Sequence, residues 1–220
     1  MHPKKLQKIG GIAAISEALI YITAFIFYGG ILVFPDKNAP AQETLNFFSD
    51  NHFTLSALNL MSYVLFGIFL VVLVTAIYER FKCYSIHLSK IIAAFGMIWV
   101  VLVIACGMIA NIGLHQVIER GVTEPENTML IWSSVSIITE GLGGGNEIVG
   151  GIWVLLITVI GWRQKVFSTP LNLLGIIVGI AGILTVYPLE IFTEIFGISQ
   201  IVWFIWIGIL MIRKPLVGIN

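Results

Sequence analysis

Charged side chains are scarce in this chain of 220 residues. Asp, Glu, Lys and Arg make up 11% of the sequence, whereas a typical soluble domain contains about 25%. Hydrophobic residues account for 58%, so water is not the main solvent of the chain. The 12 basic and 12 acidic residues cancel, which leaves no excess positive charge to attract nucleic acid. The composition predicts an all-α integral membrane protein whose main partner is the lipid bilayer.

Cysteines and motifs for metal binding or catalysis are also scarce. Cys83 and Cys106 are the only cysteines, and they fall in a predicted loop and a predicted span, so we expect free thiols. No His-x-x-His, His-x-x-x-His or Glu-x-x-His spacing concentrates metal ligands. No serine stands in the context of a Ser-His-Asp site either. We therefore predict no metal and no cofactor, and the sequence identifies no catalytic residue.

Long apolar runs divide the chain into six predicted membrane spans. We place them at residues 9–34, 53–78, 91–115, 146–162, 171–187 and 195–212, and each has a length that can cross a hydrocarbon core of about 30 Å. The first run is longer than the apolar part of a signal peptide, so we expect it to remain as a span. With loops this short, the spans predict one helical domain over residues 1–220.

Residues 124–141 predict a helix of a different character. Thr123 and Glu126 have the spacing of a capping box at its start. Ser133, Ser136 and Glu140 share one face and apolar side chains share another, which is unsuited to lipid on all sides. The glycine-rich residues 141–145 then predict a break or kink. We expect this helix to lie at the outer interface or to re-enter the membrane, and a bundle of seven spans is the alternative.

Basic residues predict the orientation, because Lys and Arg accumulate in cytoplasmic loops. Six spans leave only Lys37 and Arg120 on the outer side. They place ten on the inner side: Lys4, Lys5, Lys8, Arg80, Lys82, Lys90, Arg163, Lys165, Arg213 and Lys214. This bias predicts a plasma (inner) membrane protein with cytoplasmic N- and C-termini.

Two glycine- and tryptophan-containing patterns resemble a known family. They are GGGNEIVGGIWVLL at residues 143–156 and QIVWFIWIG at residues 200–208. The chain is similar here to a bacterial family of small membrane proteins, catalogued as domain-of-unknown-function family 4386. The resemblance extends from the lysine-rich start to the basic residues near the end. It implies a polytopic helical fold, but it implies no reaction and no site residues.

Glu17 is the clearest ionisable residue within a predicted span. It lies about eight residues into the first span, or roughly 12 Å from its cytoplasmic end. A carboxyl group inside a membrane is costly, by about 2.5–3.5 kcal/mol on insertion scales, and needs a partner or a purpose. Glu17 is either a proton- or cation-binding carboxylate or a protonated side chain that bonds a neighbouring helix.

Most other polar residues of the spans gather near their predicted outer ends. We expect them to converge on one outward-facing pocket, with the helix over residues 124–141 as a lid. The candidate ligand-binding residues are Asn59, Asn111, His115, Glu140, Asn146, Glu147, Glu190 and Gln200, and His52 lies at the same end. Glu147 is the strongest candidate because it directly follows the glycine-rich break, although a structural hydrogen bond would also explain it.

Three functional hypotheses remain open at this point. The first is a protein that binds or transports an ion, a lipid head group or a small metabolite through the outer pocket. The second is a membrane-embedded enzyme that uses acid-base or metal chemistry at Glu147, Glu140 or His115. The third is an accessory subunit that packs against a membrane partner or a second copy through small residues such as Gly175 and Gly179.

Overall fold

The computed structural model describes residues 3–36, 38–143, 147–187 and 189–214, and these are helical apart from short connections. Within these described ranges, four helical stretches are long and apolar enough to cross a membrane: Pro3–Ile31, His52–Phe81, Ile86–Gly121 and Glu190–Arg213. Two shorter apolar helices, Ile148–Arg163 and Thr169–Leu184, accompany them. Among the described residues there is no strand, so the all-α prediction is confirmed at this level.

Two of the long stretches are not uniform α-helices. The first consists of α1 (Pro3–Ile26) and the π-helical η1 (Phe27–Ile31). The second consists of α3 (His52–Asn59), the π-helical η2 (Leu60–Leu65) and α4 (Phe66–Phe81). Between them lies the short α2 (Ala41–Asp50). A π-helical turn contains an extra residue, and such turns occur frequently at functional sites.

The middle of the chain departs from the predicted bounds. The helix α5 (Ile86–Gly121) continues six residues beyond the predicted end at His115. The next helix, α6 (Pro125–Leu142), lies within one residue of its predicted bounds. The prediction of a capping box at its start is wrong. Glu124 is the N-cap residue and makes no side-chain capping bond, while the hydroxyl of Thr123 donates to the carbonyl of Arg120. Proline at the first helical position starts α6 instead.

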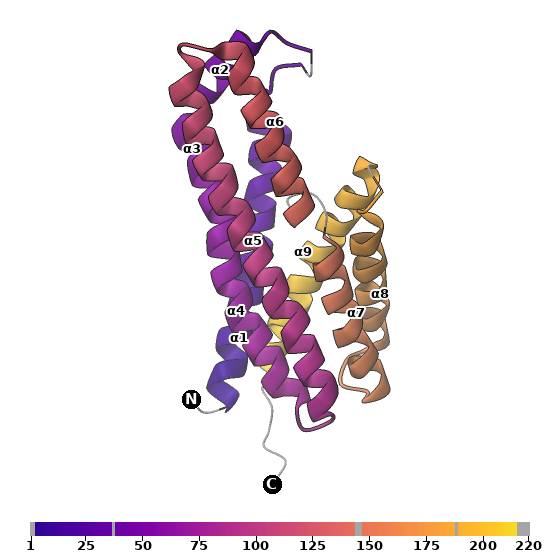
Figure 1. Ribbon diagram of the computed structural model, residues 1–220. Helices are drawn as coiled ribbons and strands as arrows, with labels where there is room; N and C mark the ends of the chain where they lie inside the picture. The colour runs from indigo at the N-terminus through magenta and orange to yellow at the C-terminus, as the bar shows by residue number, and fades with distance from the viewer. Residues whose placement is uncertain (1–2, 37, 144–146, 188, 215–220) are drawn as a thin grey trace.

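The predicted break after α6 is confirmed at Gly143. This residue adopts a left-handed conformation with φ of 111° and ends the helix, a geometry that glycine adopts without steric cost. Figure 1 shows that α6 runs back along α5 and ends midway along the molecule. Helix α7 (Ile148–Arg163) then continues in the same direction toward the end where both termini lie.

The last three helices pack beside the long bundle. Helix α7 packs against α8 (Thr169–Leu184), and α9 (Glu190–Arg213) packs against α8 and α1. Glycines permit these contacts: a Cβ on Gly151 would lie 2.7 Å from the carbonyl oxygen of Gly179, and a Cβ on Gly208 would lie 2.7 Å from that of Gly11. Small residues allow helix backbones to approach closely in lipid.

The core has two parts. The larger cluster fills the bundle and includes Trp153, Trp203 and Phe204, all fully buried. A smaller cluster at the opposite end from the termini joins α2, α3, α5 and α6, with Phe48 against Trp132 at a ring-centroid distance of 4.7 Å. At the end with the termini, buried Arg80 donates to the Gln7 side chain at 2.9 Å and joins α4 to α1.

We predict that Gly151→Ala lowers the thermal unfolding midpoint in detergent by several degrees. The new methyl group would meet the α8 backbone, and overpacking of this kind costs about 1–3 kcal/mol. Gly141→Ala is the matched control, because no atom lies within 4 Å of its Cβ position. Equal midpoints for the two variants would contradict the close α7–α8 contact.

Candidate functional site

Three irregular segments, far apart in the sequence, surround one cavity. The segment η1 contributes Tyr28, η2 contributes Ser62 and Tyr63, and the interruption between α6 and α7 contributes Gly143 and Glu147. Each departs from regular α-helix where the chain borders the cavity. Irregular backbone at membrane depth is tolerated only where protein or a water-filled cavity satisfies its polar groups. The coincidence identifies the cavity as a candidate site.

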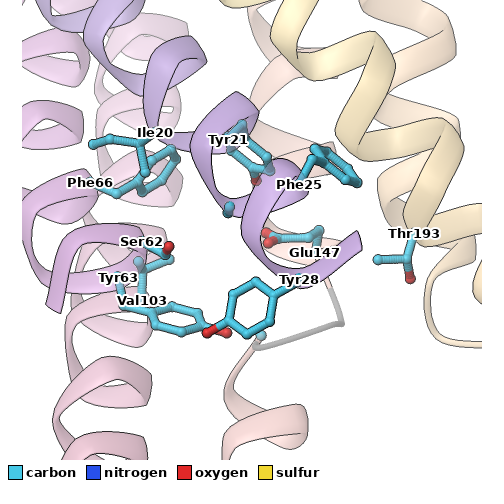
Figure 2. Close-up of a pocket in the computed structure, with 12 residues that line it drawn as sticks. Ile20, Tyr21, Phe25, Tyr28, Ser62, Tyr63, Phe66, Val103, Glu147 and Thr193 are labelled. Atoms are coloured by element: carbon cyan, nitrogen blue, oxygen red, sulfur yellow. The ribbon is translucent and has the colours of Figure 1, made fainter. Parts of the chain in front are cut away.

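The cavity has a volume of about 270 Å³ and a mostly apolar wall. Helix α1 forms one side, and Figure 2 shows the side chains of Tyr21 and Phe25 on one side of Glu147 and those of Tyr28 and Tyr63 on the other. The described residues that line it are Ile20, Tyr21, Ala24, Phe25, Tyr28, Ser62, Tyr63, Phe66, Val103, Gly143, Glu147 and Thr193. Aromatic rings and a single carboxyl group therefore dominate its chemistry.

Glu147 is held in place by three other helices. The indole Nε1 of Trp99 on α5 donates to its Oε2 at 3.0 Å, and Tyr21 on α1 forms a second side-chain hydrogen bond with it. Its backbone amide donates to the Thr185 hydroxyl at 2.8 Å, and that hydroxyl donates to the Gly182 carbonyl at 2.7 Å. An indole N–H can only donate, so the Trp99 contact orients Glu147 as an acceptor.

A second polar group lies deeper, at the contact between α1 and α9. Glu17 and Gln200 are both 0% exposed. Within the described residues, neither the carboxyl oxygens of Glu17 nor the amide atoms of Gln200 have a hydrogen-bond partner. Such groups are costly when buried without partners.

The register of α1 against α9 brings this pair close to the cavity. Gly11 packs against Gly208 and Phe25 against Gly197, so the two helices are antiparallel, and both Glu17 and Gln200 fall between these contacts. Tyr21 follows Glu17 by one helical turn and interacts electrostatically with both Glu17 and Glu147. Tyr21 lines the cavity, so the cavity wall reaches within one helical turn of Glu17.

Most of the other sequence-predicted site residues lie away from the cavity wall. His52 and His115 stack with ring centroids 6.0 Å apart, and Asn111 accepts a hydrogen bond from the Ser56 hydroxyl. Asn59 is partly buried at the end of α3. These residues belong to the region where α3 meets α5, so the structure gathers them with one another and not around Glu147.

The remaining acids occupy two further places. Glu140 is exposed near the end of α6, close enough for an electrostatic interaction with Glu147. Glu190 and Glu194 are exposed on the first turns of α9, while Gln200 lies deeper on the same helix. Asn146 lies outside the described residues. Among the described residues, no three His, Cys, Asp or Glu side chains are grouped to hold a metal ion.

The sequence analysis missed the tyrosines of the cavity. Glu17, Tyr21 and Tyr28 follow one another at intervals of four and seven residues, so they share one face of the first helix. This spacing was a usable signal. The positions of Tyr63 and Ser62 carried no such signal, because the π-helical η2 changes which side chains face inward.

We predict that Thr185→Val loosens the start of α7. The substitution preserves the shape of the side chain but leaves the part-buried backbone amide of Glu147 without its acceptor, at a cost of about 1–3 kcal/mol. Hydrogen-deuterium exchange should increase at the beginning of α7, and the thermal midpoint should fall. Thr185→Ser keeps the hydroxyl and is the control; equal exchange in the two variants would refute the anchoring role of the hydroxyl.

The comparisons with known proteins identify the family of the chain and assign no role to the cavity. Neither a curated protein nor a solved structure matches the chain. A family model described as "Domain of unknown function (DUF4386)" matches residues 9–214, which includes every residue of the cavity wall. The resemblance noted in the sequence is thus confirmed, and the chain belongs to the DUF4386 family.

Proposed function

We propose that this protein is a membrane protein that binds a small ligand in the cavity around Glu147, from the outer side of the membrane. The ligand classes that fit are an ion, a lipid head group or a small metabolite. The supporting observation is the meeting of three irregular segments at one cavity that contains a fixed carboxyl group. Ligand sites of this type are mostly apolar, with a few positioned polar groups.

The proposed topology has six membrane spans. The first span is α1 continued by η1, and the second is α3 continued by η2 and α4. The other four spans are the single helices α5, α7, α8 and α9. Helix α7 has 16 residues and a length of roughly 24 Å, which is shorter than the hydrocarbon core of about 30 Å. Local thinning of the bilayer accommodates such a helix, and α6 extends the same path on the outer side.

The charge distribution supports an inner-membrane protein of a bacterium with cytoplasmic termini. The start of α1, the α4–α5 turn, the α7–α8 turn and the end of α9 lie at the same end of the molecule (Figure 1). All ten basic residues that the sequence analysis assigned to the inner side belong to these segments. Glu147 precedes α7, whereas Arg163 ends it, so the cavity lies toward the opposite, outer side.

A transport role is the second candidate, and the buried pair of Glu17 and Gln200 favours it. Polar groups without partners deep in a membrane protein commonly mark ion or proton pathways. Tyr21, on the cavity wall, is one helical turn from Glu17. A proton or cation that enters at Glu147 therefore has a second polar position at Glu17, slightly more than halfway along α1 from its basic end.

We predict that Thr193→Cys reacts with a membrane-impermeant maleimide added to intact cells, in a background with both native cysteines replaced by serine. Thr193 is exposed at the cavity wall, so an outward-facing cavity makes this position accessible. The native thiol of Cys83 is also exposed, but it lies between α4 and α5. In a separate protein that retains Cys83 as its single cysteine, this thiol should react only after the membrane is permeabilised.

The two positions together test both the topology and the side on which the cavity opens. Protection of residue 193 in intact cells, or reaction of Cys83 without permeabilisation, would refute an outward-facing cavity. Cys106, retained as the single cysteine, is a further reference. It is buried beside the Thr139 carbonyl, so it should react slowly in intact and in permeabilised cells.

A further inference from the structure

We propose that the cavity around Glu147 binds an organic cation with an ammonium group, of the size of a choline or ethanolamine head group. This proposal rests on the proposed binding function and names its ligand class. It combines three properties of the cavity: its aromatic wall, its volume, and an acidic residue with no basic residue among the described lining residues.

The wall supplies the surface that ammonium groups prefer. Five of the lining residues are aromatic: Tyr21, Phe25, Tyr28, Tyr63 and Phe66. The face of an aromatic ring attracts a cation within about 6 Å of its centroid, and groups of such rings recognise quaternary ammonium ligands. Figure 2 shows these side chains on different sides of the Glu147 carboxyl group. A cation beside that group would therefore have aromatic rings around it.

The charge of the lining selects the sign of the ligand. Among the described lining residues there is no Lys, Arg or His, and Glu147 is the single acidic one. The Trp99 N–H and Tyr21 form hydrogen bonds with Glu147, which orient its carboxyl group toward a ligand in the cavity. Glu140 adds negative charge nearby. A cation beside this carboxyl group favours its ionised form and is balanced by it, whereas an anion would find no basic side chain among the described lining residues.

The remaining polar groups distinguish an organic cation from a bare metal ion. Calcium takes six to eight oxygen ligands and magnesium requires near-octahedral coordination, whereas this cavity offers one carboxylate with scattered hydroxyl groups. An ammonium group with methyl or methylene substituents needs less dehydration and matches an apolar wall. The volume of about 270 Å³ lies just below the range of about 300–1,000 Å³ for drug-sized ligands, so a compact ligand fits.

The test compares choline with 3,3-dimethylbutan-1-ol, in which carbon replaces the charged nitrogen and the shape is preserved. Purified protein with Thr193→Cys in the cysteine-free background is treated with maleimide at constant ionic strength. Choline should slow the alkylation and raise the thermal midpoint, while the neutral isostere and acetate should do neither. Equal protection by the neutral isostere, or protection by acetate alone, would overturn the proposal.

Two cavity variants provide an independent measurement. Glu147→Gln removes the carboxyl group and should weaken choline binding more than about tenfold. Glu194→Gln is the control and should leave binding unchanged, because Glu194 is exposed outside the cavity wall. Tyr28→Phe keeps the ring, whereas Tyr28→Leu removes it and should weaken binding by about 3- to 30-fold. Unchanged binding in both Glu147→Gln and Tyr28→Leu would refute the assignment even if one variant folds poorly.

The source of the ammonium group is resolved by lipid composition. Nanodiscs of phosphatidylcholine should protect residue 193 without added choline if the ligand is a lipid head group. Nanodiscs of phosphatidylglycerol with free choline should protect it if the ligand is soluble. Absence of protection by choline in both membranes would overturn the cation proposal. Reaction of residue 193 from outside would still support the outward-facing cavity, so the two failures are distinguishable.

Discussion

The structure depends on one constraint, namely that every backbone polar group needs a partner when its surroundings are apolar. Regular helices satisfy this constraint within each segment, and most of the chain consists of them. Departures are therefore informative, because η1, η2 and the break after α6 each disturb helical hydrogen bonding. At the break, the Thr185 hydroxyl accepts a hydrogen bond from the backbone amide of Glu147. A side chain from another segment thus serves as the partner of this amide.

The same contact links packing to the cavity. The hydroxyl of Thr185 also bonds the Gly182 carbonyl on α8, and Gly182 packs against the backbone of Gly151 on α7. The close α7–α8 contact thus positions the start of α7, and the start of α7 positions Glu147. Trp99 then fixes the carboxyl group from α5. These helices present one acid to a cavity whose described wall carries five aromatic residues, an arrangement that suits a cationic ligand.

The candidate site could be predicted only in part from the sequence. Glu147 stood out because an acid directly after a glycine-rich break is unusual, and the structure places it in the cavity wall. Gln200 was predicted to lie with the outer residues. It lies inside the bundle instead, because α9 begins at Glu190 and Gln200 is nearly three turns into this helix. His115 and Asn111 share a helical face, but the long α5 places them beside α3 instead of the cavity.

The sequence alone determined the class of the protein, the approximate helices and the family, because these depend on local composition and on the length of apolar runs. Tertiary structure decided which polar residues meet. The tyrosines at positions 21, 28 and 63 come from two helical stretches. They reach one cavity only because α1 packs against α4 and because the π-helical turns change the direction of the side chains. Helix periodicity specifies a face, but the partner of that face depends on contacts between segments distant in the chain.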